Sequence, residues 1–162
     1  MQQADYCRVP ITKRDGTVIA HALVDPEDFE RIAAHPWCLR HGYARRHVKH
    51  PDGVWRPIHM HREILGDPPA GMTIDHVNRD GLDNRRANLR IVPVAGNIQN
   101  LTPRKGTASR YRGVTFHKAS GLWFASATLR GVRHSLGYYR DEDEAGAAAA
   151  AWRRENMPYA TD

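Results

Sequence analysis

The sequence predicts an α+β protein that combines small antiparallel sheets with short helices. Short runs of strand-forming residues are separated by turns containing Gly, Asp or Pro, which indicates antiparallel strands joined by tight connections. Capped helical segments lie between these runs and after them. At 162 residues the chain has room for one large or two small hydrophobic cores.

The first 65 residues predict two hairpins with a helix between them. Residues 10–24 place strand-forming residues on both sides of Asp15-Gly16, a dipeptide favoured in hairpin turns. Asp25 is the expected N-cap of a short helix that Pro36 ends. Residues 37–65 predict a second hairpin, whose return strand runs into a helical turn.

The next segment alternates between short strands and loops. MTIDHV (72–77) and LRIV (89–92) are expected strands joined by the loop NRDGLDNRRAN, and PVAGNIQNL after them predicts a helix. The polar, turn-rich stretch that follows is typical of a domain boundary. We therefore expect a first domain over 1–102, a linker at 103–107 and a second domain over 108–160.

The second domain predicts three strands followed by one helix. Strand-like runs cover 111–117, 122–130 and 132–139, with turns between them. Asp141 and Glu144 stand three residues apart, as in a capping box, ahead of an alanine run that suits close packing on a sheet. The expected second domain is thus a small three-stranded antiparallel sheet packed on one helix.

The charge of the chain favours a polyanionic partner. The formal net charge is +6, and residues 101–140 contain eight Lys and Arg but no Asp or Glu. No apolar run approaches the roughly 20 residues of a membrane helix, so no membrane partner is expected. The start of the chain lacks a secretory pattern, which predicts a cytoplasmic location. Cys7 and Cys38 are too few for a disulfide framework or a four-cysteine zinc site, and we expect reduced thiols.

Residues 74–100 contain the side chains that phosphodiester hydrolysis requires, namely a base, ligands for a cation and groups that position them. His76 is suited to act as the base, because a neutral imidazole accepts a proton near pH 7. Asp75 and the carboxamide of Asn97 offer hard oxygen ligands for Mg²⁺. Asn88 is placed to hydrogen-bond across the loop and to orient the imidazole.

At these residues the sequence resembles the HNH endonuclease family, in the homing-endonuclease branch that is common in phage genomes. The resemblance rests on IDHVNRDGLDNRRANLRIV followed by GNIQN, with HMHREIL upstream, and it covers a motif core over 57–101. It implies a β-hairpin and a helix around one divalent metal ion, the ββα-metal fold, with Mg²⁺ expected and Mn²⁺ as the alternative. Many family members also bind structural zinc through cysteine knuckles, which this chain lacks, so no structural zinc is expected.

Carried over residue by residue, the resemblance implies that His76 is the general base and Asp75 a metal ligand. It makes Asn88 the residue that stabilises the loop. The second metal ligand is Asn97 or, in the same N-x-x-N pattern, Asn100, and the first position favours Asn97. Asp83 and Asn84, in the connecting loop, are expected turn formers.

The sequence allows more than one role for three residues of HMHREIL. His61 and Arg62 match the HR pair that precedes the family's motif, and the resemblance implies that this pair contacts the phosphate or buttresses the site. His59 and His61 share one strand face, which also allows a second metal site, although structural and DNA-contacting roles are favoured.

The C-terminal residues resemble the Apetala-two DNA-binding domain of plant transcription factors and homing endonucleases. The matching residues are YRGV at 111–114, Trp123, Ala125, Leu136-Gly137 and the EAGAAAAAW helix. The resemblance implies that a three-stranded sheet enters the major groove of DNA, with the helix behind it. Together with Arg62, the expected DNA-binding residues are Arg110, Arg112, His117, Phe124, Ser126, Thr128, Arg130, Arg133 and Ser135.

These features predict a metal-dependent endonuclease that hydrolyses phosphodiester bonds in double-stranded DNA. One active centre per chain makes nicking by a monomer the simplest outcome, whereas cutting both strands needs two chains or two binding events. The alternative is a catalytically inactive DNA-binding regulator that retains the nuclease fold, and the presence of the whole motif favours the enzyme. RNA binding is disfavoured, because Phe124 alone is expected as a stacking aromatic on the sheet.

Overall fold

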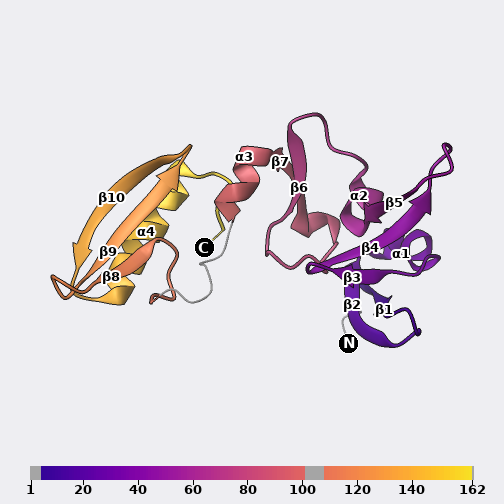
Figure 1. Ribbon diagram of the computed structural model, residues 1–162, viewed down its shortest axis with the longest axis horizontal. Helices are drawn as coiled ribbons and strands as arrows, with labels where there is room; N and C mark the ends of the chain where they lie inside the picture. The colour runs from indigo at the N-terminus through magenta and orange to yellow at the C-terminus, as the bar shows by residue number, and fades with distance from the viewer. Residues whose placement is uncertain (1–4, 101–107, 162) are drawn as a thin grey trace. The chain divides into compact units, whose positions relative to one another are not determined.

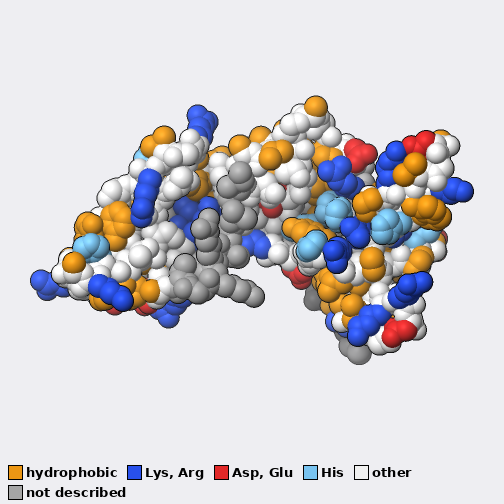
Figure 2. Space-filling model, viewed as in Figure 1, with side chains coloured by type: hydrophobic (Ala, Val, Ile, Leu, Met, Phe, Trp, Pro, Cys, Tyr) orange, Lys and Arg blue, Asp and Glu red, His pale blue; other side chains and the backbone are white. Residues whose placement is uncertain are grey.

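The computed structural model describes residues 5–100 and 108–161, and the chain divides into two compact units, Met1–Pro93 and Val94–Asp162 (Figure 1). Small antiparallel sheets and short helices build the described chain, so the predicted α+β class is confirmed. The expected linker at 103–107 lies outside the described residues. Lys and Arg side chains lie on the visible face of both units (Figure 2). Within the described residues, none of the helices combines the length and the apolar character that crossing a bilayer requires.

The first unit begins with the hairpin that the sequence predicts. Strands β1 (Cys7–Thr12) and β2 (Val18–Val24) pair antiparallel. In the turn between them, Asp15 Oδ1 accepts a hydrogen bond from Thr17 N at 3.0 Å, and Gly16 adopts a φ of 86°. This positive φ explains why glycine stands at the second position of the turn.

Helix α1 (Pro26–Ala33) follows the hairpin, and Asp25 occupies its N-cap position. The expected side-chain cap is absent, because the Asp25 carboxylate accepts a hydrogen bond from Arg86 N at 2.7 Å instead. A residue 61 positions along the chain has thus displaced the local cap and joined the start of α1 to the segment before β7.

The next sheet has three strands where the sequence predicts one hairpin. The chain turns at His41 and Gly42, which adopt φ values of 49° and 84°, and this turn divides the first expected strand into two. The last strand runs directly into a helix, as predicted. The elements are β3 (Cys38–Arg40), β4 (Tyr43–Lys49), β5 (Trp55–His59) and α2 (Met60–Leu65).

A final antiparallel pair, β6 (Met72–His76) and β7 (Leu89–Pro93), completes the first unit. The loop between these strands ends in the 3₁₀ turn η1 (Arg86–Asn88). This pair is the hairpin that carries the expected catalytic residues.

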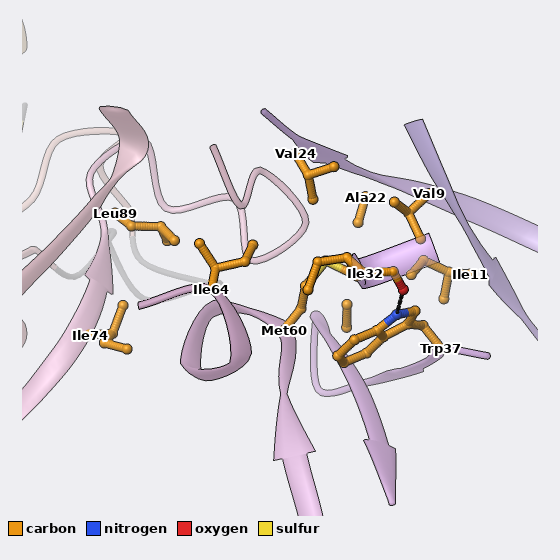
Figure 3. Close-up of a cluster of buried hydrophobic side chains, with 11 residues drawn as sticks. Val9, Ile11, Ala22, Val24, Ile32, Trp37, Met60, Ile64, Ile74 and Leu89 are labelled. Atoms are coloured by element: carbon orange, nitrogen blue, oxygen red, sulfur yellow. Dashed lines mark hydrogen bonds between the residues drawn. The ribbon is translucent and has the colours of Figure 1, made fainter. Parts of the chain in front are cut away.

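The hydrophobic core of the first unit joins these sheets and helices (Figure 3). Trp37 is almost fully buried, and its Nε1 donates a hydrogen bond to Ile32 O at 2.8 Å. Ile64 of α2 belongs to the same cluster as Ile74 of β6 and Leu89 of β7. The apolar contacts therefore hold the β6–β7 pair against the rest of the unit.

The second unit confirms the predicted three-stranded antiparallel sheet packed on one helix. Its buried centre consists of Val114 and Ala125 from the sheet and Ala145 and Ala149 from the helix. The elements of the unit are α3 (Val94–Asn97), η2 (Ile98–Asn100), β8 (Val114–His117), β9 (Leu122–Leu129), β10 (Val132–Tyr139) and α4 (Glu142–Asn156).

The start of α4 also confirms its prediction. Asp141 accepts hydrogen bonds from Asp143 N at 2.7 Å and Glu144 N at 3.1 Å. Small residues face the sheet, and a Cβ at Gly146 would lie 2.5 Å from the ring of Tyr111. The absence of a side chain there allows the helix to approach this ring closely.

Candidate active site and nucleic-acid interface

Asp75 and His76 are adjacent at the end of β6, and both are buried. Arg90, opposite Asp75 in the β6–β7 register, donates two hydrogen bonds to Asp75 Oδ2, from Nε at 2.9 Å and Nη2 at 2.7 Å. The sequence reasoning missed this ion pair. It fixes the carboxylate of the expected metal ligand from across the strand pair.

The ring of His76 lies in a small group of aromatic and imidazole rings. Its centroid is 5.6 Å from that of Tyr43 and 5.1 Å from that of His61. Nε2 of His76 lies 3.3 Å from Oδ1 of Asn84, whose side chain is fully buried. Asn84, expected only to form a turn, is therefore the residue whose carboxamide meets the imidazole.

Burial is the main influence on the pKa of His76, and it lowers that pKa below the ordinary value of 6.5. The hydrogen bond to Asn84 and the nearby charge of Asp75 oppose this shift. The balance favours a neutral imidazole near pH 7, which is the form that accepts a proton.

Asn88 stabilises the loop by hydrogen bonds to its other end. Asn88 Oδ1 accepts from Asn78 N at 2.9 Å, and Nδ2 donates to Asn78 Oδ1 at 2.9 Å and to Asp83 O at 2.7 Å. Asp83 in turn pairs with Arg85 at 2.7 Å. Asn84 N donates to Leu23 O at 2.8 Å, which ties the loop to β2. These bonds give the loop next to His76 one defined conformation.

His59 and His61 stack in parallel, with centroids 5.2 Å apart and an interplanar angle of 5°. Burial and the neighbouring His76, His59 and Arg62 lower the pKa of His61 to about 3. Burial and two arginines also lower the pKa of His59. Among the residues that the structure describes, no group of three His, Cys, Asp or Glu side chains is arranged to hold a metal ion.

The low pKa of His61 predicts a loss of stability in acid. Unfolding restores the ordinary pKa near 6.5, so the unfolded chain binds a proton that the folded chain excludes, and stability falls as the pH drops from 6.5 toward 3. Between pH 7.5 and pH 5 we expect this group to remove about 2 kcal/mol from the free energy of unfolding.

Urea unfolding of His61→Gln at both pH values, with chelator present, measures this contribution. The difference in unfolding free energy between the two pH values should shrink by about 2 kcal/mol relative to the parent. The matched variant His35→Gln, at an exposed histidine after α1, should leave the difference unchanged. Equal acid sensitivity in the parent and in His61→Gln would contradict the prediction.

The two candidate asparagine ligands belong to the second unit. Asn97 is the last residue of α3 and is half-buried, and Asn100, the last residue of η2, is buried. Both therefore lie in the compact unit that begins at Val94, whereas Asp75 lies in the first. The choice of Asn97 as metal ligand stays a prediction.

One face of the second unit's sheet points away from α4 and carries most of the expected DNA-binding side chains. The register places Thr128 beside Arg133 and Ser126 beside Ser135. Phe124, on the same side of β9, lies under the guanidinium of Arg133, with 5.3 Å between the Arg133 Cζ and the ring centroid. Ser126 is buried, and Arg133 Nη2 donates to its Oγ at 3.2 Å.

A β-bulge in β10 adds a second aromatic ring to this face. The register shifts between Ser135 and Gly137, so Tyr138 rather than Gly137 pairs with Phe124. The Tyr138 and Phe124 centroids lie 4.9 Å apart, and His117 lies 5.7 Å from Tyr138. The expectation that Phe124 would be the only stacking aromatic on the sheet was therefore wrong, because regular alternation does not hold through a bulge.

The remaining expected DNA-binding residues lie elsewhere. Arg110 forms an ion pair with Asp143, at the first turn of α4, and this partner raises the pKa of Arg110. Arg112 donates to Gln99 O. Arg130 is exposed in the turn between β9 and β10, and Arg62 pairs with Asp67 at 2.8 Å. The structure thus brings together His117, Phe124, Ser126, Thr128, Arg133 and Ser135 on one sheet face. Arg110, Arg112 and Arg130 lie elsewhere in the second unit, and Arg62 belongs to the first unit.

Comparison with known proteins connects the first of these sites with a nuclease family. The HNH endonuclease family model matches residues 58–99, from β5 to η2. The chain is also similar to Protein 3.8 of Escherichia phage T7, with 27% identity over 92 residues that cover 57% of this chain and 68% of that protein. No solved structure matches. The matches indicate nuclease activity for this region, and the family model ends before the β8–β10 sheet, where the Apetala-two resemblance stays a prediction.

Proposed function

We propose that this protein is a metal-dependent DNA endonuclease that nicks double-stranded DNA, with His76 as the general base. The observation that supports this most is the environment of His76, a buried imidazole with a lowered pKa that meets the carboxamide of Asn84. The residue lies within the segment that matches the HNH endonuclease model.

The hydrogen bonds of Asn84 indicate which nitrogen of His76 acts. Asn84 Nδ2 donates to Gly81 O at 3.4 Å, which turns Oδ1 toward His76. An amide oxygen only accepts hydrogen bonds, so we assign the ring proton to Nε2 and the role of proton acceptor to Nδ1. Nδ1 of His76 then takes a proton from the attacking water, while Asn84 holds the ring in place.

Asp75 is the proposed carboxylate ligand of one divalent metal ion, and Asn97 is the proposed second ligand. The donor set suits Mg²⁺, with Mn²⁺ as the alternative, since Mg²⁺ binds through few carboxylates and keeps positions for water and phosphate oxygens. Arg90 orients the Asp75 carboxylate through Oδ2. When bound, the metal ion would offset the negative charge that develops on the phosphate. The donor set contains no cysteine, and no role for structural zinc is proposed.

The second unit is proposed to bind DNA in the manner of an Apetala-two domain. Its outward sheet face combines Arg133, the exposed Thr128 and Ser135, and the stacked rings of Phe124 and Tyr138. Such a face suits phosphate and base contacts in the major groove. The binding unit would position the substrate, and a monomer with one active centre would cut one strand.

The proposed role is of the homing type, and the similarity to a phage protein supports a location in the cytoplasm of an infected bacterium. The proposal combines this similarity with the motif at 74–100. The proposed substrate is double-stranded DNA, and no membrane partner is proposed.

Incubation of supercoiled plasmid with the purified protein tests the proposed function. We expect relaxed circles to appear with Mg²⁺ and not with chelator. The appearance of full-length linear product before relaxed circles would contradict nicking. Plasmid that stays supercoiled in both Mg²⁺ and Mn²⁺ would contradict the proposed endonuclease activity.

A second candidate is an inactive DNA-binding regulator that retains the nuclease fold. The ion pair between Asp75 and Arg90 favours it, because a guanidinium already neutralises the carboxylate that would bind the metal ion. The same plasmid assay separates the two candidates, since the regulator would shift the plasmid in a binding gel without relaxing it.

A further inference from the structure

The sheet β3–β4–β5 has one face that the core of the first unit does not cover. The other face packs inward, since Ala44 is buried and Arg46 forms an ion pair with Glu63 of α2 at 2.8 Å. Residues directly opposite in an antiparallel sheet share a face. From the register, the uncovered face, called here the basic sheet face, consists of Cys38, Arg40, Tyr43, Arg45, His47, Lys49, Trp55, Pro57 and His59.

The charges on the basic sheet face are of one sign. It carries Arg40, Arg45 and Lys49 and no Asp or Glu, and no described residue forms a salt bridge with these three. The cations on the opposite face, by contrast, form ion pairs. Arg46 pairs with Glu63, and Arg56 pairs with Asp52. Figure 2 shows histidine side chains among Lys and Arg over the first unit.

Arg45 has a polar atom whose capacity to donate a hydrogen bond is unused. Its Nε is buried and has no hydrogen-bond partner in the described structure. A buried guanidinium nitrogen without a partner is unfavourable, and an anion bound there would satisfy it. His59, directly across the strand pair from Arg45, has its pKa lowered in part by this positive charge.

The basic sheet face continues into the candidate active site through Tyr43. The ring of Tyr43 lies 5.9 Å from that of His59, 5.8 Å from that of His61 and 5.6 Å from that of His76. The loop of the site packs on the same ring, since a Cβ at Gly81 would lie 2.6 Å from it. A phosphate backbone lying along β4 would therefore lead from Lys49 past Arg45 to His76.

We propose that the basic sheet face binds the phosphate backbone of duplex DNA beside the bond that is cut, with Arg45 contacting the phosphate nearest to His76. The inference rests on the proposed nuclease function and adds a second DNA contact surface, in the catalytic unit itself. Lys49, at the far end of β4, contacts a phosphate further along the strand, with the exposed Trp55 opposite it, and Arg40 contacts a phosphate from its position opposite the exposed Tyr43. All the charges on the basic sheet face are positive, and a polyanion is complementary to the whole face. We therefore propose DNA as the ligand of this face.

Fluorescence anisotropy with a fluorescein-labelled 30-base-pair duplex, in chelator and at several NaCl concentrations, tests the proposal on the full chain. Each lost phosphate contact should make the slope of log K against log salt less steep by about 0.9. Arg40→Ala, Lys49→Ala and Arg45→Gln should each show this change, and Arg45→Lys should restore the parent slope. Arg56→Ala removes the same charge from the opposite face and should leave the slope unchanged.

The outcomes separate this inference from the proposed function. If the parent nicks plasmid and the face variants match Arg56→Ala in slope, the inference fails and the nuclease assignment stands. If the parent binds no duplex, both fail. If the face variants alter sedimentation of the protein but not its salt slope, the face is an interface between copies and the inference is wrong. Thermal melting identifies any variant that fails to fold, and Arg40→Ala, at an exposed residue, then provides the test.

Discussion

His76→Ala is expected to reduce nicking of supercoiled plasmid by at least about 100-fold while leaving DNA binding within about twofold of the parent. The imidazole is the proposed proton acceptor, and its position is fixed by Asn84 at 3.3 Å. General base catalysis contributes roughly 10²-fold to 10⁴-fold, so removing the base affects the rate far more than the affinity. Initial rates of relaxed-circle formation in Mg²⁺, with anisotropy in chelator, measure the two quantities.

His35→Ala provides the control for this variant. His35 is an exposed histidine of the same unit, beyond the end of α1, and its loss should change neither quantity. Nicking by His76→Ala at a rate near that of the parent would remove His76 from the role of base. A parallel loss of binding would show that the variant had disturbed the fold instead.

Gly113→Ala is expected to destabilise the second unit by roughly 3 kcal/mol or more. Gly113 has a φ of 82°, and a Cβ at this position would lie 2.1 Å from the backbone oxygen of Ser126. The same residues form a backbone hydrogen bond, from Ser126 N to Gly113 O at 2.8 Å, which closes the turn before β8 onto β9. The extra atom would separate the turn from the sheet. Chemical unfolding followed by near-ultraviolet circular dichroism measures the change.

Gly131→Ala isolates the contribution of the steric clash. Gly131 has a nearly identical φ of 80°, but a Cβ there would meet no atom within 4 Å. It should therefore lose only the roughly 1–2 kcal/mol that a left-handed backbone costs an alanine. Equal losses in the two variants would mean that the clash with Ser126 has no effect.

The sequence predicted the local elements well, because their signals are short-range. The Asp15-Gly16 turn and the Asp141 cap depend on residues within three positions of one another, and both are present. The side-chain cap expected from Asp25 is missing, because Arg86 competes for the carboxylate. That competition depends on tertiary packing, which local patterns do not encode.

In the candidate site, too, the sequence predicted the residues of the local motif and not the contacts that depend on tertiary packing. The motif identified Asp75, His76 and Asn88, but the contacts of Arg90 and Asn84 were not expected. The pairing of Arg90 with Asp75 depends on the register of two strands joined by a long loop, and no tight turn fixes that register in the sequence. Asn84 fits a turn by composition, and only the folded loop shows that its carboxamide is buried against the imidazole.

The extra residue in β10 determines which of two neighbouring tyrosines is available to a ligand. Tyr138 is exposed beside Phe124, while Tyr139 belongs to the residues packed on the buried cluster. If β10 kept its present length but ran without the bulge, Gly137 would stand opposite Phe124, and the surroundings of the two rings would be exchanged without any change of side chain. At this point of the sheet, the register of the backbone as well as residue identity decides the chemistry that is offered to a partner.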